Sequence, residues 1–184
     1  MQSKTVIVSF SSRNGGNCEQ ILDHIQTHIN NRTNVFVYKF SEFDIKPCGK
    51  CSYQCFENNN ACPYINDMEY SLLSQICNSN EAYFIVPNYC DYPCANFFIF
   101  NERSQCYFQS HPERLEQYLQ VKKKFIVVSN SEAETFINAF RQHTDQEPNV
   151  LFLSARKYGC NSVDGDLLTA DAAKDALAAF IGCH

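Results

Sequence analysis

Four cysteines gather in the first third of the chain, where Cys48, Cys51, Cys55 and Cys62 follow the spacing C-x2-C-x3-C-x6-C. Thiolates are the usual ligands of structural zinc and of four-iron clusters, so four of them within fifteen residues can close on one metal centre. Three states of this loop stay open on residue chemistry alone. They are a four-iron cluster, a zinc ion, and a reduced loop without metal.

A polar loop near the N-terminus, from Ser9 to Cys18, combines hydroxyls, two glycines and the guanidinium of Arg13 just before a predicted helix. Backbone N–H groups and the dipole at a helix start attract anions, and an arginine adds charge-assisted hydrogen bonds, so this loop suits a phosphate. It lacks the lysine of a nucleoside-triphosphate loop and does not match G-x-G-x-x-G. An ordinary polar loop with a helix cap is the alternative. The candidate phosphate-binding residues are Ser9, Ser11, Arg13, Gly16, Asn17 and Cys18.

A second loop, at residues 87–96, follows the third predicted strand and carries Tyr89 among several polar residues. A flat aromatic side chain and free backbone groups are what a planar heteroaromatic ring needs for stacking and for hydrogen bonds to its edge. A tyrosine that only packs against the protein is the alternative. The candidates for contact with such a ring are Pro87, Asn88, Tyr89, Cys90 and Asp91, with Ser129 and Asn130 on the other side.

These loops must be positioned by an alternation of short apolar strands and helix-period segments, which runs from end to end of the chain. We expect strands at residues 5–8, 34–40, 82–86, 125–128 and 150–153, with amphipathic helices between them. This alternation predicts an α/β fold with a doubly wound five-stranded parallel sheet in the order 2-1-3-4-5, because right-handed crossovers cover both faces. Ligands bind such sheets beyond the carboxyl ends of the strands, where the first and third strands meet, and both loops fall there.

Local signals set the expected ends of several elements. Pro87 is expected to close the third strand and Pro93 to lie in the first turn of the next helix, which we expect at about residues 95–108. Ser131 and Glu134 form a capping-box signature for the helix that follows them. The last helix is expected at about residues 171–181, with the inward side chains Ala172, Ala176, Leu177, Phe180 and Ile181.

Length and composition indicate one domain spanning residues 1–184, with a cysteine-rich loop at about 44–66, because 184 residues that are 45% hydrophobic can bury one core. The net charge of -5 has the wrong sign for a general nucleic-acid binder. No apolar run approaches the roughly 18 residues of a membrane span and no export signal is visible, so we expect a cytoplasmic protein without a membrane partner. The chain has eleven cysteines, an odd count that argues against a disulfide framework. Four of them have no motif spacing, and their simplest role is to fill small apolar spaces: Cys77, Cys106, Cys160 and Cys183.

The two polar loops carry a family resemblance. The first resembles the G-S-P-R-x-x-G-N-S loop of the flavodoxin-like NAD(P)H-dependent FMN reductases and iron–sulfur flavoproteins, with matches at Ser11, Arg13, Gly16 and Asn17. The second resembles that family's P-V-Y-F-x-x-x-S-A-x-x-K-x-F-x-D-R segment, with matches at Pro87, Tyr89, Ala95, Phe100 and Arg103. The chain departs from this pattern at four places, where Phe10 and Ser12 replace Gly and Pro, Cys18 replaces a hydroxyl residue, and Asn88 replaces an aliphatic one.

This resemblance implies FMN as the cofactor, with its phosphate on the first loop and its isoalloxazine ring against the second, and NAD(P)H as co-substrate. The cysteine loop is similar to the cluster-binding C-x2-C-x2-C run of the iron–sulfur flavoproteins, with the second and last gaps each about one residue longer. The leading hypothesis is an FMN-dependent oxidoreductase that passes electrons from NADH or NADPH to a small-molecule or protein acceptor. An electron carrier, and a metal-binding module with a degenerate flavin site, are alternatives from other classes. The resemblance further suggests a homodimer or higher homo-oligomer.

Overall fold

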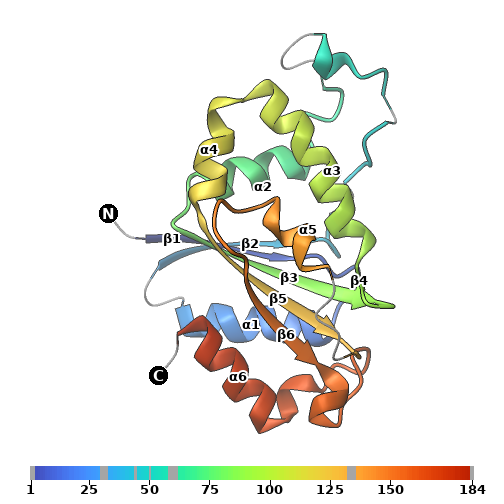
Figure 1. The fold of residues 1–184 in the computed structure, drawn as a ribbon, viewed down its shortest axis with the longest axis vertical. Coiled ribbons are helices and arrows are strands. Elements are labelled where there is room, and N and C mark those ends of the chain that lie inside the picture. The colour runs from blue at the N-terminus through green and yellow to red at the C-terminus, as the bar shows by residue number, and fades with distance from the viewer. Residues whose placement is uncertain are drawn as a thin grey trace.

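The computed structural model describes residues 3–29, 33–43, 45–49, 51–57, 62–131 and 136–182. Its centre is a parallel sheet of five strands in the order β2 (Thr33–Lys39), β1 (Ser3–Ser9), β3 (Glu81–Tyr89), β5 (Lys122–Ser129) and β6 (Asn149–Ser154) (Figure 1). A two-residue strand, β4 (Tyr92–Pro93), pairs antiparallel with the end of β3. The predicted α/β class and the predicted strand order are confirmed.

Helices cover both faces of the sheet (Figure 1). One face carries α1 (Asn17–Ile29) and α6 (Asp171–Ile181), and the other carries α2 (Met68–Cys77), α3 (Ala95–Ser110), α4 (Glu113–Gln120) and α5 (Ile137–Arg141). Three 3-10 turns complete the described elements, namely η1 (Gln54–Phe56), η2 (Ala155–Tyr158) and η3 (Leu167–Thr169). None of these helices is both long and apolar enough to cross a membrane.

The core has two parts because side chains alternate between the faces along each strand. Val6 and Val8 of β1 pack on the side of α2 and α3, whereas Ile7 between them packs on the side of α1 and α6. Phe84 and Ile85 of β3 divide in the same way. Strands buried on both faces have near-continuous apolar sequences. The positions of these strands were therefore predictable from the apolar runs in the sequence.

The predicted ends of two elements are wrong around the second loop. β3 continues through Pro87 to Tyr89, and Pro87 pairs with Val128 of β5, while its carbonyl oxygen accepts a hydrogen bond from the N–H of Cys94 at 3.0 Å. Pro93 belongs to β4, and α3 begins after it at Ala95. Sheet pairing therefore overrides the local preference of proline for a strand end or a helix start.

Two other expectations concern the last third of the chain. The range 171–181 of the last helix is confirmed, but its fully buried side chains are Ala173, Leu177 and Ile181, each one helical turn apart, and Ala172 is exposed. The capping-box residue Glu134 lies outside the described residues. Helix α5 begins at Ile137, and the residue before it has a left-handed backbone conformation with φ of 60°.

Candidate functional site

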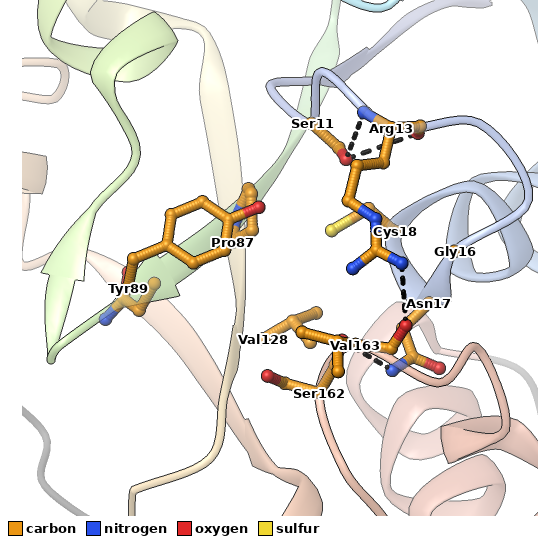
Figure 2. A pocket seen from close by; sticks show the side chains of 11 residues that line it. Ser11, Arg13, Gly16, Asn17, Cys18, Pro87, Tyr89, Val128, Ser162 and Val163 are labelled. Atoms are coloured by element: carbon orange, nitrogen blue, oxygen red, sulfur yellow. Dashed lines mark hydrogen bonds between the residues drawn. The ribbon is translucent and has the colours of Figure 1, made fainter.

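A cleft opens at the carboxyl ends of β1, β3 and β5, at the switch point where open α/β sheets bind ligands. It has a narrow part around the first loop and a wider part, of about 320 Å³, around the second. The narrow part is lined by Ser11, Arg13, Gly16, Asn17, Cys18, Pro87, Asn88, Tyr89, Val128, Ser162 and Val163 (Figure 2). The wider part is lined by Asn88, Tyr89, Cys90, Asp91, Ser129, Asn130, Ser131, Arg156, Ser162 and Val163.

All but one of the residues predicted to hold a cofactor line this cleft. The exception is Ser9, which is buried at the end of β1, where its carbonyl oxygen accepts a hydrogen bond from the N–H of Phe40 at 2.9 Å. Five further lining residues were missed by the sequence analysis. They are Val128, Ser131, Arg156, Ser162 and Val163.

Phe10 anchors the first loop in the core. Its ring is fully buried and lies 4.9 Å from the ring of Phe40 and 5.3 Å from that of Phe97, between ring centroids. Two more phenylalanine rings, those of Phe84 and Phe100, lie within 5.6 Å. A phenylalanine at the place where the family pattern has glycine therefore fixes the root of the loop by burying an aromatic side chain beneath it.

Side-chain hydrogen bonds hold the rest of the loop in shape. The amide of Asn96, in the first turn of α3, donates to the carbonyl oxygen of Phe10 and to the hydroxyl of Ser12, both at 2.9 Å. The hydroxyl of Ser11 accepts from the N–H of Arg13 at 3.1 Å. The loop is thus organised before any ligand arrives, which lowers the entropy cost of binding.

The start of α1 faces the narrow part of the cleft and can receive an anion. The first N–H groups of a helix have no intrahelical acceptor, and they carry the positive end of the helix dipole. Space is open at Gly16, where no heavy atom lies within 4 Å of the position a Cβ would take. Nearby, the carboxylate of Glu19 accepts from the N–H of Gly15 and from Lys39 Nζ at 2.6 Å. The hydrogen bond from Lys39 has the larger effect and that from Gly15 the smaller, and both lower the pKa of Glu19. Lys39 also neutralises the charge of the carboxylate.

The thiols beneath this loop are neutral. Burial raises the pKa of the Cys18 thiol to about 12, and burial raises that of Cys94 to about 11. The Cys94 thiol donates to the carbonyl oxygen of Phe10 at 3.3 Å. Burial also raises the pKa of the Tyr89 phenol. Because all three groups stay protonated at physiological pH, none of them opposes the positive charge of Arg13.

A segment from the far end of the chain, Asn161 to Leu167, closes one side of the narrow part. The guanidinium of Arg13 donates to the carbonyl oxygen of Val163 at 2.9 Å, and Asn17 Nδ2 donates to that of Ser162 at 3.0 Å (Figure 2). Asn17 Oδ1 also accepts from the N–H of Leu167 at 2.9 Å. Two residues predicted to bind a cofactor therefore also position this segment.

Asn130, after β5, fixes the same segment from the other side. Its Oδ1 accepts from the N–H of Ser162 at 2.7 Å, and its Nδ2 donates to Asn161 Oδ1 at 3.0 Å. Gly165 packs so close to the first loop that a Cβ on it would lie 2.9 Å from the carbonyl oxygen of Gly15. The one signal for this segment in the sequence is its run of Asn, Ser, Asp and Gly, which indicates a turn but not what the turn contacts.

Asn88 brings an unsatisfied polar group into the cleft. Its side chain lines both parts of the cleft and is 5% exposed, and its Oδ1 has no hydrogen-bond partner within the described structure. A buried acceptor without a partner costs on the order of 1–3 kcal/mol. A ligand with an N–H group at this position would remove that cost, so the observation points to a ligand with a polar edge.

The second loop forms a tight hairpin that makes one wall of the wider part. Cys90 and Asp91 are its two central residues and both have positive φ, 50° and 66°, as a type I′ turn requires. Tyr89 is 48% exposed and lies across the narrow part from Arg13 (Figure 2). The ring of Tyr92 packs against that of Phe136, with 4.2 Å between centroids. Figure 2 thus shows a tyrosine side chain and a cationic side chain on opposite sides of the narrow part.

The cysteines predicted as metal ligands do not come together as a set of four. Cys48 Sγ lies 3.6 Å and Cys55 Sγ 3.8 Å from Cys106 Sγ, which belongs to α3 and which the sequence analysis treated as a filler. In the part of the chain that the structure describes, no three His, Cys, Asp or Glu side chains are placed to hold a metal ion. As they stand, these thiols do not fit a four-iron cluster or a zinc ion, and the set of Cys48, Cys51, Cys55 and Cys62 stays a prediction.

Comparisons with known proteins bear on the fold. No family model and no curated protein matches the sequence. Among solved structures, RosB with a bound intermediate is similar, with a TM-score of 0.65 and 11% identity over 98% of this chain and 76% of that one. The Trp repressor binding protein from Bacillus subtilis has a TM-score of 0.61 and 13% identity, over 96% of each chain. FerB from Paracoccus denitrificans has a TM-score of 0.56 and 13% identity, over 98% of this chain and 96% of that one. At such identities the likeness concerns the fold, and the chain has a flavodoxin-like, doubly wound α/β fold.

Proposed function

We propose that this protein is an FMN-dependent oxidoreductase that accepts a hydride from NADH or NADPH and passes the electrons to a small-molecule or protein acceptor. The observation that carries the proposal is the meeting of two features in one cleft. The start of α1 and Arg13 lie at one end, and the unsatisfied amide oxygen of Asn88 lies next to a half-exposed tyrosine at the other. FMN has a phosphate and a flat ring with a polar edge, and it matches both.

At the phosphate end, the chain supplies a positive potential. The start of α1 offers backbone N–H groups, and Arg13 offers a guanidinium that already donates to a carbonyl oxygen, that of Val163. A charge-assisted bond to phosphate is stronger than one to a neutral carbonyl, so the phosphate would compete well for Arg13. The neutral Cys18 thiol stands where a hydroxyl is usual, and it adds no negative charge.

At the ring end, the chain supplies orientation. Asn88 Oδ1 would accept from a ring N–H group, and Tyr89 would border the ring. Bound flavin supplies the hydride chemistry itself, so the protein needs no acid or base of its own in this cleft. Ser129, Asn130 and Asp91 line the wider part, where a second substrate must approach the ring.

Arg156 gives that wider part a preference for negative charge. It lies in η2, directly after β6, and it is exposed on the wall that faces the hairpin. A guanidinium binds phosphate groups well, and the nicotinamide dinucleotides carry them. We infer that Arg156 contacts the dinucleotide or an anionic acceptor.

Solved structures of similar fold support the proposal. One of them is described as an NADH:FMN oxidoreductase (EMOB, apo form), with a TM-score of 0.53 and 11% identity over 97% of this chain and 88% of that one. FerB is described as a flavoenzyme NAD(P)H:(acceptor) oxidoreductase. RosB was solved with 8-demethyl-8-formylriboflavin-5'-phosphate, a flavin phosphate.

The test is a comparison of FMN with riboflavin, which lacks only the phosphate. Quenching of flavin fluorescence is measured as the protein is titrated into each flavin. We expect FMN to bind at least about tenfold more tightly, since charge-assisted bonds are each worth about 1.5–3 kcal/mol. Equal affinity for the two flavins would remove the phosphate from the first loop, and no quenching of either would end the proposal.

A further inference from the structure

We propose that Cys48 and Cys106 form a redox-active dithiol, which a small disulfide oxidises to an intramolecular disulfide that ties the cysteine-rich loop to α3. This site is separate from the flavin cleft, and it does not depend on the flavin function. The proposal starts from the disagreement between the cysteine spacing, which predicts a metal centre, and the thiol arrangement, which does not form one.

The two sulfur atoms are in contact although they are 58 residues apart in the sequence. Cys48 Sγ and Cys106 Sγ are separated by 3.6 Å, and both thiols are free. A disulfide bond is about 2.0 Å long, so a small shift of either side chain is enough to form it. A third thiol is close: Cys55, whose side chain is buried, has its Sγ 3.8 Å from Cys106 Sγ.

A buried arginine keeps the loop and the helix together. Arg103 precedes Cys106 by three residues on α3, so the two side chains lie on neighbouring parts of one helix face. Its guanidinium donates to the carbonyl oxygen of Lys46 at 2.6 Å, two residues before Cys48, and pairs with the carboxylate of Asp67 at 2.8 Å. The ring of Tyr64 lies 5.0 Å from the same guanidinium. These contacts hold the two thiols at a high effective concentration.

Burial assigns different roles to the two thiols. Cys106 is 3% exposed, whereas Cys48 is only partly buried, so a small disulfide in solution reaches Cys48 first. Cys106 is therefore a resolving thiol, and it attacks only after Cys48 has been engaged.

The reaction balances with one equivalent of a disulfide RSSR. The Cys48 thiolate attacks one sulfur of RSSR, which forms a Cys48–SR mixed disulfide and releases RS⁻. The Cys106 thiolate then attacks Cys48 Sγ and displaces the second RS⁻. Two thiol protons of the protein end on two RSH molecules, the protein dithiol is oxidised by two electrons, and RSSR is reduced by two.

A metal centre is the competing explanation, and the observations favour the dithiol. Cys48 and Cys55 each contact Cys106, yet none of the described acidic, histidine or cysteine side chains form a group of three placed to bind a metal ion. Two thiols in direct contact, one of them partly accessible to solvent, are arranged for pairing with each other. The cysteine variants described next separate the dithiol from the metal centre.

The experiment treats the reduced full-length protein with oxidised glutathione, blocks remaining thiols with N-ethylmaleimide, and maps the peptides by mass spectrometry. We expect one Cys48–Cys106 disulfide and a rise in the melting temperature of about 5–10 °C, because the bond closes a long loop. In Cys106→Ser, Cys48 should instead be trapped as a mixed disulfide with glutathione. Cys51→Ser, a change in the same loop, is the matched control and should form the disulfide normally.

Two results would overturn the proposal. One is free Cys48 and Cys106 thiols, or a disulfide between other cysteines, after oxidation of the folded protein. The other is stoichiometric zinc or iron in the purified protein that is lost in Cys106→Ser. If Cys106→Ser does not fold, Cys48→Ser serves in its place, and there Cys106 should stay unmodified by glutathione.

Discussion

The guanidinium of Arg13 donates a 2.9 Å hydrogen bond to the carbonyl oxygen of Val163, which lies 150 residues further along the chain. The first βα loop and the segment after η2 therefore form one site. Asn17 binds the same segment through the carbonyl oxygen of Ser162. Arg13, which the sequence predicts to be a phosphate ligand, thus has a structural role, since it holds one wall of the cleft in place.

Arg13→Ala should weaken FMN binding by about 2 kcal/mol, or roughly 30-fold, because a charge-assisted contact with the phosphate is lost. Riboflavin affinity should change little. Calorimetric titration of both flavins measures this, and Arg141→Ala is the matched control outside the cleft, with FMN affinity near that of the unchanged protein. A similar loss for both flavins would show that Arg13 acts through the Val163 segment and not through the phosphate.

Asn88→Leu should have opposite effects on the free and the flavin-bound protein. The free protein should melt a few degrees higher, because the substitution removes a buried oxygen without a partner and puts a larger apolar side chain of similar branched shape at the wall of the cleft. FMN should bind about tenfold more weakly, since one hydrogen bond to the ring is lost. Thermal unfolding with and without FMN gives both values. A lower melting temperature of the free protein would mean that Asn88 has a partner of its own.

Arg103→Met should destabilise the protein by about 3–5 kcal/mol, because it leaves the partly buried Asp67 and the buried Glu69 without their cation. Urea unfolding measures the change. The matched control is Arg141→Met, which removes a surface pair with Glu147 in which both side chains are more than half exposed, and it should cost less than about 1 kcal/mol. Equal losses in the two variants would contradict the anchoring role of Arg103.

Iodoacetamide at pH 8 should label Cys90 well before Cys18 or Cys94. Cys90 is exposed at the tip of the hairpin, whereas burial raises the pKa of Cys18 to about 12 and that of Cys94 to about 11. Only the thiolate reacts with iodoacetamide. Cys18 and Cys94 should therefore react slowly, because burial keeps the reagent away from them and because their thiols stay protonated. Timed quenching and peptide mass spectrometry follow the labelling. Cys18 labelling as fast as that of Cys90 would show that the cleft floor is open and charged.

Features set by local sequence were predictable. The strand positions and the range 171–181 of α6 follow from apolar runs and helical periodicity, which each segment carries in its own residues, and the strand order follows from the handedness of the crossovers between them. The inward face of α6 was misplaced by one residue at Ala172, because alanine at neighbouring positions gives no contrast between faces. The β3–β4 hairpin was missed since neither Cys90 nor Asp91 is the glycine that usually marks such a turn.

Features set by distant contacts were not predictable. Arg13 meets Val163 and Cys106 meets Cys48 across 150 and 58 residues, and no periodicity in the sequence records either pairing. The cysteine spacing favoured Cys51 as a partner because it lies close in sequence, but the fold brings Cys106 there instead. Most of the lining of the cleft was nevertheless anticipated, because strand ends in a doubly wound sheet converge at one edge.

The central claim is that a reduced nicotinamide donates a hydride directly in this cleft, and anaerobic stopped-flow mixing of the FMN-loaded protein with NADH or NADPH tests it most directly. The wider part of the cleft, of about 320 Å³, leaves room for a second ring beside the flavin. We predict that one of the two nucleotides bleaches the flavin absorbance in a single two-electron step. Absence of bleaching by either nucleotide, with a chemical reductant bleaching the same flavin in two one-electron steps, would contradict the claim and identify an electron carrier.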